Sequence, residues 1–250
     1  CILQAKLGLE RSCMAMDINL GCSGWVYGLS VLSSLMQTGN IKKAILLAGD
    51  ARKQAKEELD QLFGYACTAT ALEYSKEAKP FYFDLGTDGT GYDAIIRPGG
   101  GCRNQFNEDS LKLELCEDGR KRHAIQTRMK GMDVFAFGIT TAPKSIKKLT
   151  ANYEMDYTSF DYVILHQANY KMTETIRKKL KLDAEKMPYS MLHFGNTSSA
   201  SIPLTIVTQL KGKIEDKPTK IIGCAFGVGL SWGTVAFETE HLLISELVEV

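Results

Sequence analysis

Short apolar runs alternate with longer stretches of helical periodicity along this chain, and this alternation most narrows the folds that it can adopt. The runs with the length and apolar content of strands are residues 43–50, 69–74, 161–165, 220–225 and 231–238. The stretches with helical spacing of apolar side chains are residues 22–37, 131–149, 169–182 and 197–210. Such alternation predicts an α/β fold in which helices cover a sheet.

The remaining segments read as connections. We expect a strand and then a glycine-rich loop over residues 81–101, and a polar surface segment over 102–120 with a short strand near 111–115. A charged helix or loop is expected near 57–62. No GxGxxG or Walker pattern follows a strand and opens a helix, so the glycines favour a loop over a phosphate cradle. The lysines at 144, 147 and 148 are expected on a solvated helix face.

Cys22 lies at a predicted strand-to-helix turn. Residues 14–20 (MAMDINL) are predicted to form a mostly buried strand, and helical spacing begins at about Cys22. Amide hydrogens and the dipole at a helix N-terminus favour a thiolate over a thiol, and the Cys22 amide could point at an oxyanion. Gly21 and Gly24 permit a tight turn. The same pattern is typical of a small buried cysteine between closely packed elements.

His166 and Asn196 follow in comparable positions. His166 comes directly after the apolar run 160–165, at the carboxyl end of a predicted parallel strand, where open α/β sheets bind ligands. A histidine there is more often a hydrogen-bonded core residue, but a reactive cysteine elsewhere in the chain favours a catalytic role. Asn196 is either part of a helix-capping cluster or a neutral donor to a developing negative charge.

Four segments carry a family resemblance. They are residues 17–30 (DINLGCSGWVYGLS), 163–169 (VILHQAN), 193–203 (HFGNTSSASIP) and 225–233 (AFGVGLSWG). In this order and spacing they resemble the β-ketoacyl-acyl-carrier-protein synthase III family, and the likeness extends from Cys1 to about Glu238. Each segment alone is moderately specific, whereas four in order make chance resemblance improbable.

The resemblance implies a thiolase-like fold, a layered α/β/α/β/α duplication. Residues 1–80 would be the remainder of the N-terminal half with the nucleophile, and residues 81–250 the C-terminal half with the histidine and asparagine. Residues 1–9 resemble the helix just before the nucleophile strand, so the first half would be incomplete and lack the first quarter to third of a family member. We expect such a piece to be poorly active and poorly stable alone.

The resemblance also implies a mechanism. Cys22 would be the nucleophile, with His166 and Asn196 stabilising an enolate, in the decarboxylative Claisen condensation of an acyl-CoA primer with malonyl-acyl-carrier protein that initiates fatty acid biosynthesis. No cofactor would be needed beyond the two substrates, acyl-CoA and malonyl-acyl-carrier protein. The enzyme would be a homodimer. Val228 would supply the second oxyanion amide and Phe226 would shield the nucleophile, although a core aromatic fits Phe226 nearly as well. The pantetheine channel would be lined by Gly131, Phe135, Ala168 and Asn169.

Departures from the family pattern keep alternatives open. Val228 stands where the family usually has glycine, and Ala136 where many members carry a basic residue for carrier docking, while Lys171 retains one positive charge. A specialised acyltransferase or ketosynthase of secondary metabolism is therefore an alternative. A non-catalytic ketosynthase-fold partner subunit is another, but such subunits usually lose the nucleophile. Papain-like thiol hydrolases place their cysteine in a different local sequence.

Composition excludes several other classes. The net charge is +1 without a basic tract, so we do not expect nucleic acid as a partner. No apolar run is long enough to span a bilayer and no signal peptide opens the chain, so we expect no membrane partner and a cytoplasmic location. The seven cysteines show no CxxC pairing and read as reduced thiols, and the four dispersed histidines do not suggest a metal site.

Overall fold

A mixed sheet forms the centre of the computed structural model, which describes residues 1–50 and 62–249. Its four strands lie in the order β3 (Tyr82–Thr87), β10 (Ser231–Thr239), β9 (Thr219–Gly227) and β8 (Tyr162–Leu165). β8 runs parallel to β9, whereas β10 is antiparallel to β9 and to β3. Because Leu165 pairs with Cys224, the carboxyl ends of β8 and β9 lie at one edge of the sheet.

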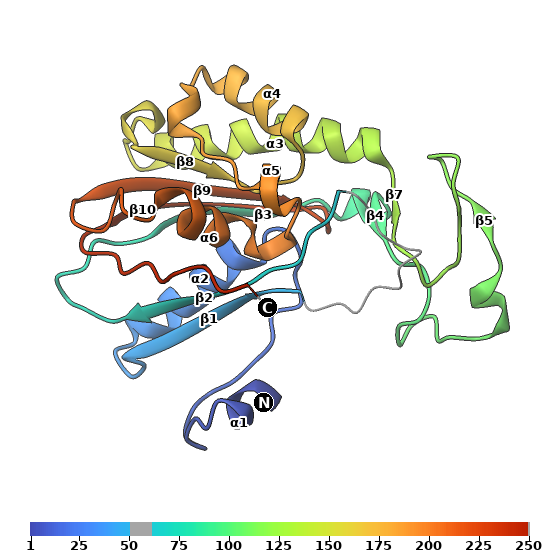
Figure 1. The fold of residues 1–250 in the computed structure, drawn as a ribbon, viewed down its shortest axis with the longest axis horizontal. Helices are drawn as coiled ribbons and strands as arrows, with labels where there is room; N and C mark the ends of the chain where they lie inside the picture. Colours follow the sequence, from blue (N-terminus) through green and yellow to red (C-terminus); the bar gives the residue numbers. More distant parts are fainter. Residues whose placement is uncertain (51–61, 250) are drawn as a thin grey trace.

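Helices α3 (Gly131–Asn152) and α4 (Tyr170–Leu180) cover one face of this sheet (Figure 1). Their apolar sides join the sheet in a buried cluster that includes Ile146, Leu149, Ile176, Ile222 and Phe226. Burial of aliphatic side chains at helical spacing is what holds such helices on a sheet. The helices and strands expected from periodicity in this half of the chain are confirmed within a few residues at each end.

Helices α2 (Gly24–Gln37) and α6 (Ser201–Thr205) pack on the opposite face. Beyond them lies a two-stranded antiparallel sheet of β1 (Lys43–Gly49) and β2 (Cys67–Glu73) (Figure 1). The part of the chain that the structure describes therefore has an α/β/α/β order of layers. The outward side chains of Ile45 and Leu47 on β1 are 56% and 46% exposed, since no described element covers them.

The buried cluster on this face draws on both expected halves of the chain. Trp25 and Leu29 of α2 pack with Ile202 of α6 and Ile221 of β9. The division at residue 80 therefore runs through a continuous core, and two separate units stay a prediction.

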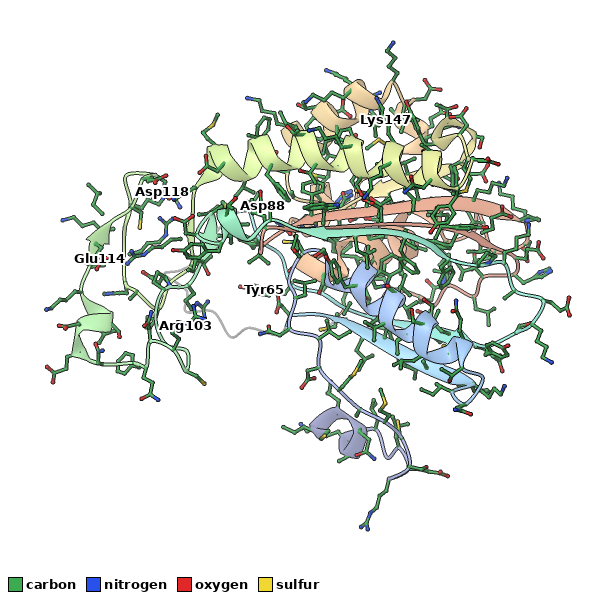
Figure 2. The ribbon with its side chains drawn as sticks, turned by 180° about the vertical axis from the view of Figure 1, so that it is seen from behind. Tyr65, Asp88, Arg103, Glu114, Asp118 and Lys147 are labelled. Atoms are coloured by element: carbon green, nitrogen blue, oxygen red, sulfur yellow. The ribbon has the colours of Figure 1, made fainter. Side chains whose placement is uncertain are left out.

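The remaining elements are short. They are α1 (Ile2–Lys6), η2 (Gly89–Gly91), β4 (Ile95–Ile96), η3 (Glu108–Leu111), β5 (Glu114–Leu115), β6 (Lys121–Arg122), β7 (Arg128–Met129), η4 (Tyr157–Ser159), η5 (Ala184–Lys186), α5 (Met191–Phe194), η6 (Ser198–Ala200) and the π-helical η7 (Ile206–Leu210). The segment with Arg103, Glu114 and Asp118 extends as an arm beyond the sheet (Figure 2). Among residues 1–50 and 62–249, no helix is long and apolar enough to cross a bilayer.

The buried strand predicted over residues 14–20 is wrong, because this segment pairs with no described strand and leaves Met14 58% and Met16 50% exposed. Alternating apolar residues give a strand its period, but a strand also needs a neighbour to complete its backbone hydrogen bonds. The helix or loop expected near 57–62 lies outside the described residues apart from Leu62.

Asp84 anchors α3 to the sheet through a buried polar network. Its Oδ2 accepts hydrogen bonds from Ser145 Oγ at 2.7 Å and from Trp232 Nε1 at 3.3 Å. Lys148 Nζ lies 2.6 Å from Asp84 Oδ1, although the lysine side chain is 61% exposed. Lys148 therefore lies on the solvated helix face expected from the sequence, and its long side chain also reaches back to a carboxylate that is 5% exposed.

Replacing Asp84 with alanine should lower the free energy of unfolding by about 2–3 kcal/mol, because Ser145 and Trp232 lose a charged acceptor in the interior. Urea unfolding followed by circular dichroism measures this. The matched control is Lys147→Ala on the same helix, whose exposed side chain projects away from the sheet (Figure 2) and should change stability by less than about 0.5 kcal/mol. An unchanged urea midpoint for Asp84→Ala would contradict the proposed anchor.

Candidate active site

Cys22 lies just before α2, at the point where this helix meets the end of β9. Ser23 is the N-cap residue, and the Gly24 amide donates to the Gly21 carbonyl at 2.7 Å, which closes the turn. A Cβ atom on Gly227 would lie only 2.5 Å from Cys22 Sγ. A side chain at 227 would therefore displace the sulfur, so a glycine is needed there.

Two backbone amides reach the sulfur of Cys22. The N–H groups of Cys22 itself and of Val228 both hydrogen-bond the thiol position. The turn that carries Val228 is held in place because Ser231 Oγ donates to the Val228 carbonyl at 2.7 Å and lies 2.7 Å from Ser23 Oγ. Two amides that converge on one sulfur can also receive the oxyanion of a thioester bound to it.

His166 contacts the same sulfur from the end of β8. Its backbone N–H donates to the Cys224 carbonyl at 2.8 Å, which continues the pairing of β8 with β9. The buried ring places Nδ1 2.8 Å from Ser201 Oγ, and its remaining nitrogen, Nε2, serves the side-chain hydrogen bond with Cys22. The strand pairing thus aims the imidazole at the cysteine.

The thiol of Cys22 is more acidic than an ordinary cysteine. Burial is the largest influence and by itself raises the pKa. The positive charge that His166 can carry, its hydrogen bond and the two amide hydrogen bonds together outweigh burial, so the pKa of Cys22 is lowered. A larger share of Cys22 is consequently thiolate at a given pH, which is the nucleophilic form.

Asn196 enters the site from the loop before η6. Its Oδ1 accepts a hydrogen bond from the Ser198 amide at 3.0 Å, so that the side-chain NH2 group, which has no hydrogen-bond partner within residues 1–50 and 62–249, can donate to a ligand. The backbone of this loop is held by residues from the first half of the chain. The Asn196 amide donates to Leu62 O at 2.9 Å, and Asn196 O accepts from the Gly64 amide at 3.0 Å.

Phe226 serves both the core and the site. It is buried in the cluster under α3, and its ring stands edge-on to the His166 ring with centroids 5.9 Å apart. Gly138 of α3 leaves room for it, because a Cβ atom there would lie 2.6 Å from Phe226 Cε2. The core and shielding interpretations of Phe226 are therefore compatible.

One cleft brings the predicted site residues together. Its lining includes Cys22, His166, Asn196, Val228, Phe226, Gly131, Phe135, Ala168 and Asn169. At about 2890 Å³ it exceeds the roughly 300–1,000 Å³ of small-molecule pockets, so it is an open cleft rather than a closed cavity. Asn169 also caps α4, accepting from the Met172 amide at 2.9 Å. The catalytic and binding roles of these residues stay predictions.

Three residues beside the site were not singled out from the sequence. Gly227 allows the close approach to Cys22, Ser201 contacts His166, and Gly64 supports the Asn196 loop, where a Cβ would lie 1.7 Å from Phe194 O. Gly227 and Ser201 fall inside the quoted motifs, but only the contacts between distant segments show what they do.

Comparisons with known proteins agree with this geometry. Residues 16–89 match the family 3-oxoacyl-[acyl-carrier-protein (ACP)] synthase III, and residues 150–239 match its C-terminal part. β-Ketoacyl-[acyl-carrier-protein] synthase III of Clostridium acetobutylicum is 30% identical over 95% of this chain and 71% of its own length. The synthase of the same name from Synechocystis is 32% identical over 92% of this chain and 68% of its own length.

A solved structure shows the same fold. The 3-oxoacyl-(acyl-carrier protein) synthase of Burkholderia xenovorans is 35% identical with a TM-score of 0.88, over 100% of this chain and 71% of that one. Fold and matches together define a thiolase-like condensing enzyme, an acyltransferase. The chain belongs to the 3-oxoacyl-[acyl-carrier-protein] synthase III family.

The thiol of Cys22 should react with iodoacetamide at lower pH than a free cysteine. Replacing His166 with alanine should move the midpoint of the pH–rate profile upward, because the charge and hydrogen bond that lower the pKa are lost. Peptide mass spectrometry separates Cys22 from the other thiols. Cys224 is an internal control, since burial raises its pKa to about 12 and it should stay unmodified in the folded protein. A midpoint that does not move in His166→Ala would contradict this electrostatic account.

Alanine at Gly21 should disturb the amide of Val228. Its Cβ would lie 2.6 Å from Val228 Cγ1, and a stiff valine cannot yield without moving its turn. We expect acylation of Cys22 to slow by about tenfold and the double variant Gly21→Ala, Val228→Ala to recover most of the rate. Gly24→Ala is the control, because its Cβ meets Ser199 at an ordinary 3.4 Å. Lack of recovery in the double variant would show that crowding by Val228 is not the cause.

Proposed function

We propose that this chain catalyses the decarboxylative Claisen condensation of an acyl-CoA primer with malonyl-acyl-carrier protein, the initiating step of fatty acid biosynthesis. The observation that carries the proposal is the convergence on Cys22 Sγ of two backbone amides and the His166 side chain, in a cleft that Asn196 also lines. Acyl transfer through a thiol needs a nucleophile and oxyanion donors, and the decarboxylative step needs donors to the enolate oxygen.

In the first half-reaction, the Cys22 thiolate attacks the carbonyl carbon of the acyl-CoA thioester. The resulting oxyanion accepts hydrogen bonds from the amides of Cys22 and Val228, which already converge on this point. The carbon–sulfur bond to CoA then breaks. CoA leaves as a thiolate that takes a proton from water, and the acyl group stays on Cys22.

In the second half-reaction, malonyl-acyl-carrier protein occupies the cleft and loses carbon dioxide. The electron pair of the broken carbon–carbon bond forms a thioester enolate, whose oxygen accepts hydrogen bonds from His166 Nε2 and the Asn196 NH2 group. The enolate carbon attacks the acyl carbonyl, and Cys22 departs as thiolate. Neutral donors suit this step because neither readily protonates the enolate carbon. The Phe226 ring packed against His166 keeps this region apolar, which favours release of neutral carbon dioxide over retention of a carboxylate.

Every step uses only the substrates, water, and backbone and side-chain groups of this chain, so the proposal includes no metal or further cofactor. The family resemblance supports a homodimer that works in the cytoplasm on acyl-CoA and acyl carrier protein, without nucleic-acid or membrane partners. Lys171, near the Phe135 ring at 6.0 Å to its centroid, would offer the positive charge for the carrier at the cleft.

A specialised route of secondary metabolism is the second candidate. The observation that favours it is Val228, whose side chain lies so close to Gly21 that a Cβ atom there would be 2.6 Å from Val228 Cγ1. Such an enzyme would use the same acyl-Cys22 intermediate with a different primer or acceptor.

Labelling of Cys22 tests the proposal. The full-length protein is incubated with radiolabelled acetyl-, isobutyryl- and longer acyl-CoA, and the label is located by peptide mass spectrometry. We expect label on Cys22 and none in Cys22→Ala. Addition of malonyl-acyl-carrier protein should then move the label to the carrier.

Asn196→Ala separates the two half-reactions. It should acylate within about threefold of the parent rate but transfer label to the carrier about 10²–10³-fold more slowly, since only the second step uses its donor. Label that forms but moves to another acceptor would favour the specialised route. No label with any primer would indicate a non-catalytic partner subunit and overturn the proposal.

A further inference from the structure

Ser201 contacts His166, the candidate catalytic histidine, at the ring nitrogen that does not face Cys22. It is the first residue of α6, is fully buried, and holds its Oγ 2.8 Å from His166 Nδ1. Within residues 1–50 and 62–249, this is the one hydrogen bond that the Ser201 hydroxyl makes. A hydroxyl without access to water must use this contact, because an unpaired buried O–H is unfavourable.

The partner of one imidazole nitrogen determines what the other can do. If the Ser201 O–H donates to Nδ1, the ring hydrogen of a neutral histidine lies on Nε2, which then acts as a donor toward Cys22. If Nδ1–H donates to Ser201 instead, Nε2 has a lone pair and acts as a base. The same 2.8 Å distance fits both arrangements, and they predict different chemistry at the sulfur.

The surroundings of Cys22 favour the first arrangement. A thiolate is stabilised by hydrogen bonds donated to it, such as those from the two backbone amides that also point at this sulfur. An Nε2 lone pair facing a thiolate would be repelled. Ser201 also carries no charge, so unlike a carboxylate it does not favour the imidazolium form of His166.

We propose that Ser201 is a positioning residue that donates to Nδ1 of His166 and so keeps the hydrogen of the neutral ring on Nε2, aimed at Cys22 and at the enolate oxygen that follows. This rests on the proposed function for the enolate step alone. The position of the ring hydrogen is a property of the resting protein.

The first test reads the tautomer directly. The chain has four histidines, so ¹⁵N-histidine labelling gives few signals, and His166→Gln assigns those of His166. Spectra are recorded over a pH series, in the parent and in a Cys22→Ala background that removes the thiolate. We expect the Nε2–H tautomer in both. An Nδ1–H tautomer in the Cys22→Ala protein would overturn the proposal.

Substitution of Ser201 supplies the second test. Ser201→Ala should lose the tautomer preference and slow transfer of label to the carrier by about 10- to 100-fold, while acylation of Cys22 changes less than about threefold. Ser201→Thr retains a hydroxyl and should recover the Nε2–H signal. The matched control is Ser190→Ala, because Ser190 is as buried as Ser201 and its hydroxyl pairs with Thr205 Oγ1 of α6 at 2.7 Å and, among the described residues, not with His166.

The outcomes separate the two proposals. An unchanged tautomer in Ser201→Ala overturns the role of Ser201 whatever the activity. If the parent protein never forms acyl-Cys22, the proposed function fails, while the ¹⁵N signals still show whether Ser201 sets the tautomer. Equal losses in Ser201→Ala and Ser190→Ala would mean that general packing, and not the hydrogen bond, is responsible.

Discussion

The close contact of Cys22 with the backbone of Gly227 is the constraint on which the site depends. There is no room for a Cβ atom between them, so the turn before α2 rests directly on the end of β9. This contact places the sulfur under the amide of Val228, the next residue. On the same strand, the Cys224 carbonyl accepts the hydrogen bond from the His166 amide. One strand end therefore positions the nucleophile, an oxyanion donor and the imidazole together.

Asn196 depends on a second contact between distant parts of the chain. Residues 62–64 pair with the loop of Asn196 through two backbone hydrogen bonds, and Gly64 sits where a side chain would strike Phe194. Cys22 and Asn196 are thus held by contacts between the expected halves, whereas His166 is held by Cys224 and Ser201 within the second half. A change that loosens packing between α2 and the sheet should affect stability and the site together.

What could be predicted from the sequence depends on whether the interacting residues lie near one another or far apart in the chain. α3, β9 and β10 have strong periodicity of their own and were predicted closely, and the motifs around Cys22, His166 and Asn196 identified residues that do line one cleft. The strand predicted over residues 14–20 is wrong, because a strand also needs a second segment with which to pair. The sequence could not assign roles to three features: the Asp84–Lys148 pair, Gly227 and Ser201. Each depends on a contact between residues far apart in the chain.

Two cysteines in this structure show what makes a thiol reactive. Burial raises the pKa of both. Cys224 has one hydroxyl donor, Thr234 Oγ1 at 3.2 Å, and the nearby Asp84 carboxylate opposes ionisation further, so its pKa reaches about 12. Cys22 has two amides and His166, each delivered by a different element, and its pKa falls instead. The difference lies in the number and charge of the donors, because desolvation acts on both thiols in the same direction. Reactivity at Cys22 is therefore a property of the assembled fold. The local sequence supplies only the Cys22 amide, whereas the donors of Val228 and His166 come from other elements.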